Sequence, residues 1–143
     1  MELKVVAYHS FVPSLLCSLP VLDVGCRDFE FAKYFASGGH WVVAMDPDPE
    51  VESPKMANID YHRAALVGFG QGARKLVMDP NPEARYIAPI EEGQFRWPVE
   101  YVPAISIQTL MRSTGIDVWD LAKLNCEGEE TPILENWPGP VAR

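Results

Sequence analysis

Two acidic residues and one glycine have the types and the spacing of a ligand site. Asp23 lies in a short apolar run, Gly25 follows at a turn, and Asp46 ends the next apolar run, 21 residues after Gly25. Without a Cβ, Gly25 lets the backbone approach a ligand closely. A carboxylate placed like that of Asp46 can accept hydrogen bonds from both hydroxyl groups of a ribose. The pattern indicates a nucleoside-containing ligand. The alternative is that Asp23 and Gly25 only form a tight turn, and that Asp46 with Pro47 only caps the next one.

The elements that must position these residues form a strand–helix–strand unit. Residues 21–25 and 41–45 are short apolar runs typical of buried strands. Residues 29–35 carry aromatic side chains at helical spacing after Asp28, the expected N-cap. Strands joined in this way are parallel, with a right-handed crossover. Because ligands of such sheets bind outside the carboxyl ends of the strands, we expect the site where these two strands end.

The rest of the chain adds further strands and a proline-rich interruption. Five prolines from residue 79 to residue 103 exclude a long helix there, so a loop or an antiparallel excursion is expected. The other expected elements are a short helix at 11–19, strands at 59–66, 74–78 and 118–124, and helices at 106–113, capped by Ser106, and at 131–137. The predicted fold class is α/β: a Rossmann-like, doubly wound, mostly parallel sheet, truncated after its fourth core strand. We expect a single domain over residues 1–143.

Composition and charge restrict the partners of this chain. It has 12 Lys and Arg against 20 Asp and Glu, a net charge of −8, and few cations are therefore present to displace counterions from a nucleic acid. Three cysteines without a CxxC pair indicate neither a disulfide framework nor a zinc ribbon, and three scattered histidines indicate no metal cluster. No apolar run reaches the roughly 18 residues of a membrane span. We expect a cytoplasmic protein without a nucleic-acid or membrane partner.

The loop after Gly25 distinguishes two classes of cofactor. Dinucleotide sites use G-x-G-x-x-G, but Arg27 and Glu30 occupy the second and third glycine positions here. Asp28 and Glu30 would also repel a pyrophosphate. S-adenosylmethionine has no phosphate and carries a sulfonium cation and an ammonium group, so Asp23 can attract its amino-acid end directly or through water. We expect S-adenosylmethionine, with a nicotinamide dinucleotide as a distant alternative.

Several segments together resemble class I methyltransferases, and more narrowly the FkbM-type family. VLDVGC resembles the first motif of that class, and VVAMDPDPE resembles the end of its second strand. The segments that follow in the family's order are HRAALVGFGQGARKL, VPAISIQTLM and DLAKLNCEGEETPIL. The most specific likeness is to the family's K-I-D-x-E-G-x-E stretch, with which four residues are in register: Lys123, Glu127, Gly128 and Glu130. The resemblance covers most of residues 21–137.

The resemblance implies binding of S-adenosylmethionine and O-methylation of a small hydroxylated molecule or sugar. The residues expected to bind the cofactor are Asp23, Gly25, Cys26, Arg27, Asp46, Pro47, Ala64 and Asn125. Asp23 and Gly25 would hold the methionine end, Asp46 the ribose, and residues near Ala64 the adenine. Glu127 is the expected base and Lys123 lies near the substrate, unless these two form a structural ion pair.

Three features depart from the family pattern. Phe29 stands where the family usually has Gly, so its ring either narrows the pocket or forces the loop outward. Asn125 replaces the acid of K-I-D, which removes a negative charge. The family's fifth to seventh strands are not expected here. The alternative function is therefore a non-catalytic, degenerate domain for ligand binding or assembly. The edge of the fourth strand is expected either to form a homodimer or to be covered by the proline-rich excursion.

Overall fold

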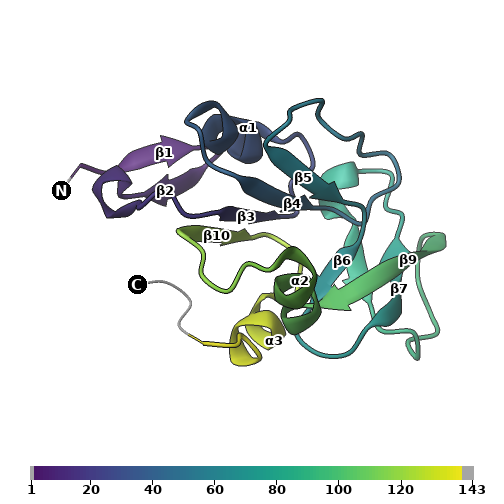
Figure 1. The fold of residues 1–143 in the computed structure, drawn as a ribbon. Coiled ribbons are helices and arrows are strands. Elements are labelled where there is room, and N and C mark those ends of the chain that lie inside the picture. The colour runs from purple at the N-terminus through teal and green to yellow at the C-terminus, as the bar shows by residue number, and fades with distance from the viewer. Residues whose placement is uncertain (1, 140–143) are drawn as a thin grey trace.

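The computed structural model describes residues 2–139, which form a mixed α/β fold with a four-stranded parallel sheet (Figure 1). The strands are β1 (Lys4–Val6), β2 (His9–Phe11), β3 (Val21–Val24), β4 (Val42–Met45), β5 (Ile59–His62), β6 (Ala65–Val67), β7 (Gly72–Val77), β8 (Tyr86–Ala88), β9 (Val99–Ser106) and β10 (Leu121–Leu124). The helices are α1 (Glu30–Ser37), α2 (Ile107–Thr114) and α3 (Glu130–Glu135), with 3₁₀ turns η1 (Pro13–Leu15) and η2 (Pro82–Ala84).

The parallel sheet has the strand order β10-β3-β4-β5. Val21 pairs with Leu121 on one side and with Val42 on the other, so the three strands end at nearly the same level. The predicted strand–helix–strand unit is confirmed in β3, α1 and β4. The strand expected at 118–124 begins only at Leu121, because the N–H of Asp120 bonds to the carbonyl of Pro20, outside the ladder.

Alternation of side chains along β3 and β4 gives the parallel sheet two apolar faces. On one face Val21, Val42 and Ala44 pack with Phe31 and Phe35 of α1. On the other, the opposite set of strand residues packs with α2, α3 and the buried ring of Trp119; this set is Leu22, Val24, Val43 and Met45. Both faces are therefore dry, which is the usual condition for parallel strands. The two faces of the sheet leave no room for a ligand, so we expect a site at the strand ends.

The predicted third strand at 59–66 is wrong as a single element. β5 ends at His62, the chain turns at Ala64, whose N–H bonds to the carbonyl of His62, and β6 then joins a different sheet. That second sheet has the order β6-β9-β7-β8 and lies to the right of the parallel sheet in Figure 1. β6 and β9 are parallel, whereas β7 is antiparallel to β8 and β9. The antiparallel excursion expected from the prolines is thus confirmed, with β9 running through Pro103.

Local contacts explain two further differences from the sequence predictions. The helix expected at 11–19 is only the turn η1, because the carboxylate of Asp120 accepts the N–H groups of Cys17 and Leu19 and holds the chain extended there. Helix α1 has Phe29, not Asp28, at its N-cap, although the side chain of Asp28 does accept the N–H of Glu30.

Helix α2 agrees with its predicted caps. Ser106 accepts the N–H of Thr109, and Gly115 ends the helix in the left-handed conformation. Helix α3 is shorter than expected, at Glu130–Glu135 instead of 131–137. Among residues 2–139, no helix has the length and apolar character needed to cross a membrane.

Candidate functional site

A cleft of about 450 Å³ opens at the carboxyl ends of β3, β4 and β10. Its far wall comes from the excursion, through η2 and the start of β8, and the turn between β1 and β2 also reaches it. Seven of the ten residues predicted for the site are on its walls: Gly25, Arg27, Asp46, Pro47, Lys123, Asn125 and Glu127. The volume falls within the roughly 300–1,000 Å³ of small-molecule sites.

Gly25 and Asp46 line the same cleft, as the sequence pattern predicted. The N–H of Gly25 donates to the carbonyl of Met45 at 2.8 Å, and the N–H of Arg27 donates to Oδ2 of Asp46 at 3.1 Å. The turn after β3 is therefore bonded directly to the end of β4.

The absence of a Cβ at Gly25 serves the sheet as well as the cleft. Gly25 has a φ of 72°, and a Cβ built there would lie 2.0 Å from the carbonyl oxygen of Asn125. The end of β10 thus occupies the space beside its Cα. An alanine here would collide with the backbone that follows β10, and the close approach of a ligand to this glycine stays a prediction.

The Asp46 carboxylate is largely buried and held by two backbone donors. In addition to the Arg27 N–H, the N–H of Asp48 donates to Oδ1 at 2.9 Å. Burial raises the pKa of Asp46, and these two hydrogen bonds oppose that shift. Each oxygen retains a free lone pair, so the group can still accept hydrogen bonds from a ligand in the cleft. Asp46 both caps the turn and faces the site, and the two interpretations of the sequence are compatible.

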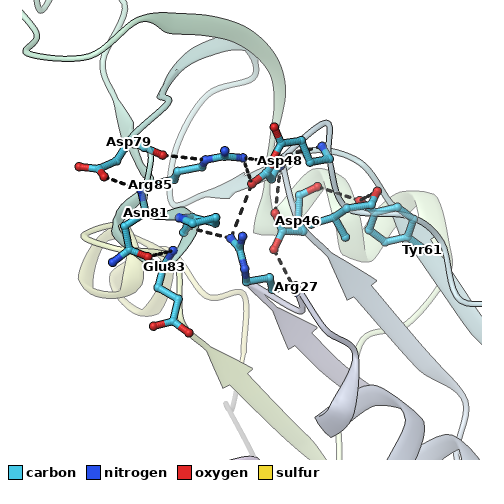
Figure 2. Close-up of polar contacts among 11 residues, drawn as sticks. Arg27, Asp46, Asp48, Tyr61, Asp79, Asn81, Glu83 and Arg85 are labelled. Atoms are coloured by element: carbon cyan, nitrogen blue, oxygen red, sulfur yellow. Dashed lines mark hydrogen bonds and ion pairs between the residues drawn. The ribbon is translucent and has the colours of Figure 1, made fainter.

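A cluster of charged residues behind Asp46 was not found from the sequence (Figure 2). We call Arg27, Asp48, Glu50 and Arg85 the Asp48 cluster. Arg85 donates from its Nη1 to Asp48 and to Glu50, each at 2.7 Å, and from Nε to the carbonyl of Asp79 at 3.2 Å. Nη1 of Arg27 donates to the carbonyl of Pro82 at 2.8 Å and lies 3.6 Å from Asp48. These contacts join the excursion to the end of β4.

A sequence pattern could have identified Asp48 as a site residue, but not Arg85. Asp48 stands two residues after Asp46 in DPDPE, and this acidic repeat could have marked it. Arg85 is a single basic residue in a proline-rich segment, 37 residues from its partner, and no local pattern identifies it.

Lys123 pairs with Asp23, not with Glu127. Its ammonium group lies 2.8 Å from Oδ1 of Asp23 and 2.7 Å from the carbonyl oxygen of Gly25. Asp23 has no exposed surface, and its Oδ2 has no hydrogen-bond partner among the described residues. Burial raises the pKa of Asp23, and the ammonium group of Lys123 opposes this. A direct contact between Asp23 and a ligand would require Lys123 to move.

The loop after β10 brings the predicted base to the cleft. Glu127 is exposed on the wall and has a φ of 52°, in the left-handed region. The turn is held by Glu130, whose carboxylate accepts the N–H groups of Cys126 at 2.7 Å and of Gly128 at 2.8 Å. The two acids of this loop therefore have different roles. Glu130 fixes the conformation of the loop, and Glu127 faces solvent and the cleft.

Besides Asp23, two of the ten predicted site residues, Cys26 and Ala64, are not on the walls of the cleft, and neither is Phe29. Cys26 is buried with the α1 cluster, and burial raises the pKa of its thiol far above the ordinary value. Ala64 is buried with the α2 cluster. The expectation that Phe29 narrows the pocket or forces the loop outward is wrong, because its ring is buried against Tyr61, with centroids 5.2 Å apart.

His9 also lines the cleft, although no sequence pattern predicted it there. It follows the turn of the β1–β2 hairpin, next to Tyr8, which is 98% exposed at the mouth of the cleft. Burial and the charge of Lys123 lower the pKa of His9, while Asp23 raises it. A neutral imidazole is therefore favoured in this cleft near neutral pH.

The described residues contain no group of three or more His, Cys, Asp or Glu side chains that could hold a metal ion. Comparison of the chain with family models, with curated proteins and with solved structures found no match.

Proposed function

We propose that this chain binds S-adenosylmethionine in the cleft and is a Rossmann-like methyltransferase of the FkbM type, acting on a hydroxyl group of a small molecule or sugar. The observation that carries the proposal is the Asp46 carboxylate, held by two backbone N–H groups at the carboxyl end of the second strand of a parallel sheet. The order β5-β4-β3-β10 is that of strands 3-2-1-4 in a nucleotide-binding sheet. A ribose diol is the ligand group that suits a carboxylate in this place.

The charge of the walls favours a cationic ligand. Six acidic side chains face three basic ones around the cleft: Asp28, Glu30, Asp46, Asp48, Glu83 and Glu127 against Arg27, Arg85 and Lys123. The excess of negative charge would repel a pyrophosphate, and no glycine-rich loop is present to bind it. The same excess attracts a sulfonium cation. The balance supports S-adenosylmethionine over a nicotinamide dinucleotide.

When bound, S-adenosylmethionine would supply an electrophilic methyl group for an in-line displacement. The contribution of this chain would be to orient the acceptor hydroxyl and to take its proton. Glu127 and His9 are both on the wall with acceptor atoms available, and Lys123 is held in place by Asp23. Tyr8 offers a flat apolar surface at the mouth, which suits the ring of an acceptor.

The second candidate is a ligand-binding or assembly domain without turnover. It is favoured by the hydrogen bonds of Lys123, which engage its ammonium group with Asp23 and the carbonyl of Gly25.

Within residues 2–139, β10 pairs only with β3, and the excursion lies over the strand ends and not along this edge. The expectation that the excursion covers the edge is therefore wrong, and a homodimer through β10 stays a proposal.

Calorimetric titration tests the proposed ligand directly. We expect heat with S-adenosylmethionine and S-adenosylhomocysteine but not with NAD, and an affinity at least about tenfold lower in Asp46→Ala, as for the loss of one charge-assisted hydrogen bond. Asp117→Ala, at an exposed acid outside the cleft, is the matched control. Absence of binding to both adenosyl compounds would refute the proposal. Binding without formation of S-adenosylhomocysteine from a panel of phenols and sugars would favour the second candidate.

A further inference from the structure

The Asp48 cluster connects the proposed ribose carboxylate to the excursion through a short series of bonds (Figure 2). Arg85 bonds to the side chain of Asp48, and the backbone N–H of Asp48 bonds to Asp46. The two hydrogen bonds are 2.7 Å and 2.9 Å long, and no exposed side chain intervenes.

Arg27 makes the same connection from the other side. Its N–H bonds to Oδ2 of Asp46, while its guanidinium bonds to the carbonyl of Pro82 in the excursion. Both oxygens of Asp46 are thus held by N–H groups of residues whose side chains contact the excursion. The orientation of the carboxylate depends on where the excursion lies.

Burial makes the Arg85–Asp48 ion pair stronger than the Arg27–Asp48 ion pair. The side chain of Arg85 is 9% exposed and that of Asp48 4%, whereas Arg27 is 38% exposed. A charge pair shielded from water keeps more of its attraction than an exposed one. Arg85 also has two other acceptors, Glu50 and the carbonyl of Asp79, so its guanidinium is fixed in position.

We propose that Arg85 is a positioning residue: by holding Asp48, it orients the Asp46 carboxylate toward the cleft, and it thereby sets the selectivity of the site for a ribose diol. The second half of this inference rests on the proposed function. The first half, that Arg85 orders the N–H groups on Asp46, does not depend on any ligand. The excursion then belongs to the binding site because Arg85 orients Asp46, which follows β4 of the parallel sheet.

Amide hydrogen exchange tests the ligand-independent half. In Arg85→Met, which keeps an unbranched apolar stem and removes the guanidinium group with its donors, the amides of Asp48 and Arg27 should exchange about tenfold faster. The Glu30 amide, bonded to Asp28 in a similar turn outside the cluster, is an internal control and should not change. Unchanged exchange at both cluster amides would overturn the inference.

A ligand pair tests the selectivity. The unsubstituted protein should bind S-adenosylhomocysteine about tenfold more tightly than its 2′-deoxy analogue. In Arg85→Met this ratio should fall to about threefold or less, whereas Arg112→Met, at an exposed arginine on α2, should leave it unchanged. A merely structural role would weaken both ligands equally and preserve the ratio, and that result would overturn the inference.

The remaining outcomes are also decisive. If S-adenosylhomocysteine does not bind at all, the proposed function fails, and the exchange rates alone decide whether Arg85 orders Asp46. If it binds with no preference over the 2′-deoxy analogue, Asp46 does not contact the ribose and the selectivity claim is overturned. Should Arg85→Met not fold, Arg85→Lys keeps the charge but cannot reach all three acceptors, so it should give an intermediate ratio.

Discussion

Replacement of Gly25 by Ala should destabilise the fold more than the same change at a glycine with the same backbone conformation. The added Cβ would lie 2.0 Å from the carbonyl oxygen of Asn125, the residue that follows the neighbouring strand β10. Gly115 has a φ of 70°, against 72° for Gly25, but no atom lies within 4 Å of its Cβ position. The two substitutions therefore separate steric contact from backbone strain.

The magnitude follows from these two terms. Strain in the left-handed region costs about 1–2 kcal/mol for a residue with a Cβ, and it applies at both positions. At Gly25 the Asn125 carbonyl would also have to move by roughly 1 Å or more, although the N–H of Asn125 is bonded to Val24. Overpacking of this kind adds about 1–3 kcal/mol. We expect a loss of about 2–5 kcal/mol for Gly25→Ala and about 1–2 kcal/mol for Gly115→Ala.

Urea unfolding followed by circular dichroism, with the m-value compared between variants, measures both losses. The unfolding free energy of Gly25→Ala should be the lower one. Equal losses in the two variants, or a loss below about 1 kcal/mol at Gly25, would refute the reasoning, because β10 could not then lie against the Cα of this glycine.

Three further outcomes are expected. Lys123→Met should lower the free energy of unfolding by about 3–5 kcal/mol, because it leaves the carboxylate of Asp23 buried without a charge partner. The double variant that also carries Asp23→Asn should recover part of this loss. No recovery would contradict the pairing of Lys123 with Asp23. The pKa of His9 is lowered, so its NMR titration should have a midpoint below 6.5. Because the folded state then disfavours the protonated imidazole, the contribution of His9 to stability is complete above pH 6.5 and falls as the pH drops through that value; a midpoint at or above 6.5 would contradict the position of His9. Cys17 is exposed and the other two thiols have strongly raised pKa values, so one cysteine should react quickly with a disulfide reagent in the native protein and three after unfolding.

The elements predicted correctly are those with strong local signals. Residues 21–25 and 41–45 are apolar runs between turn residues, and α2 has a serine cap and a terminal glycine, so each segment carries its own boundaries. The meeting of Gly25 with Asp46 follows from parallel pairing of the two strands. For the same reason seven of the ten predicted site residues share one cleft.

The errors concern features that are set by contacts between distant residues. His62 and Arg63 interrupt the apolar character of residues 59–66, but a polar interruption of this kind does not show that the two parts of the segment belong to different sheets. The turn at 11–19 is held by Asp120, about 100 residues away. His9 and Arg85 enter the site from a hairpin and from an excursion whose places were not predictable from local periodicity.

The loop after β3 shows how a tight strand–helix turn can form without several glycines. Arg27 and Phe29 have φ values of 23° and 60°, a region that residues with a Cβ normally avoid at a cost of about 1–3 kcal/mol each. Phe29 is held there by burial against Tyr61, and Arg27 by its bonds to Asp46 and Pro82. A glycine would adopt these conformations freely, but it would make neither contact. Phe29 therefore couples the loop to the core, and Arg27 couples it to the excursion. Through this coupling the orientation of Asp46 depends on residues far from it in the sequence.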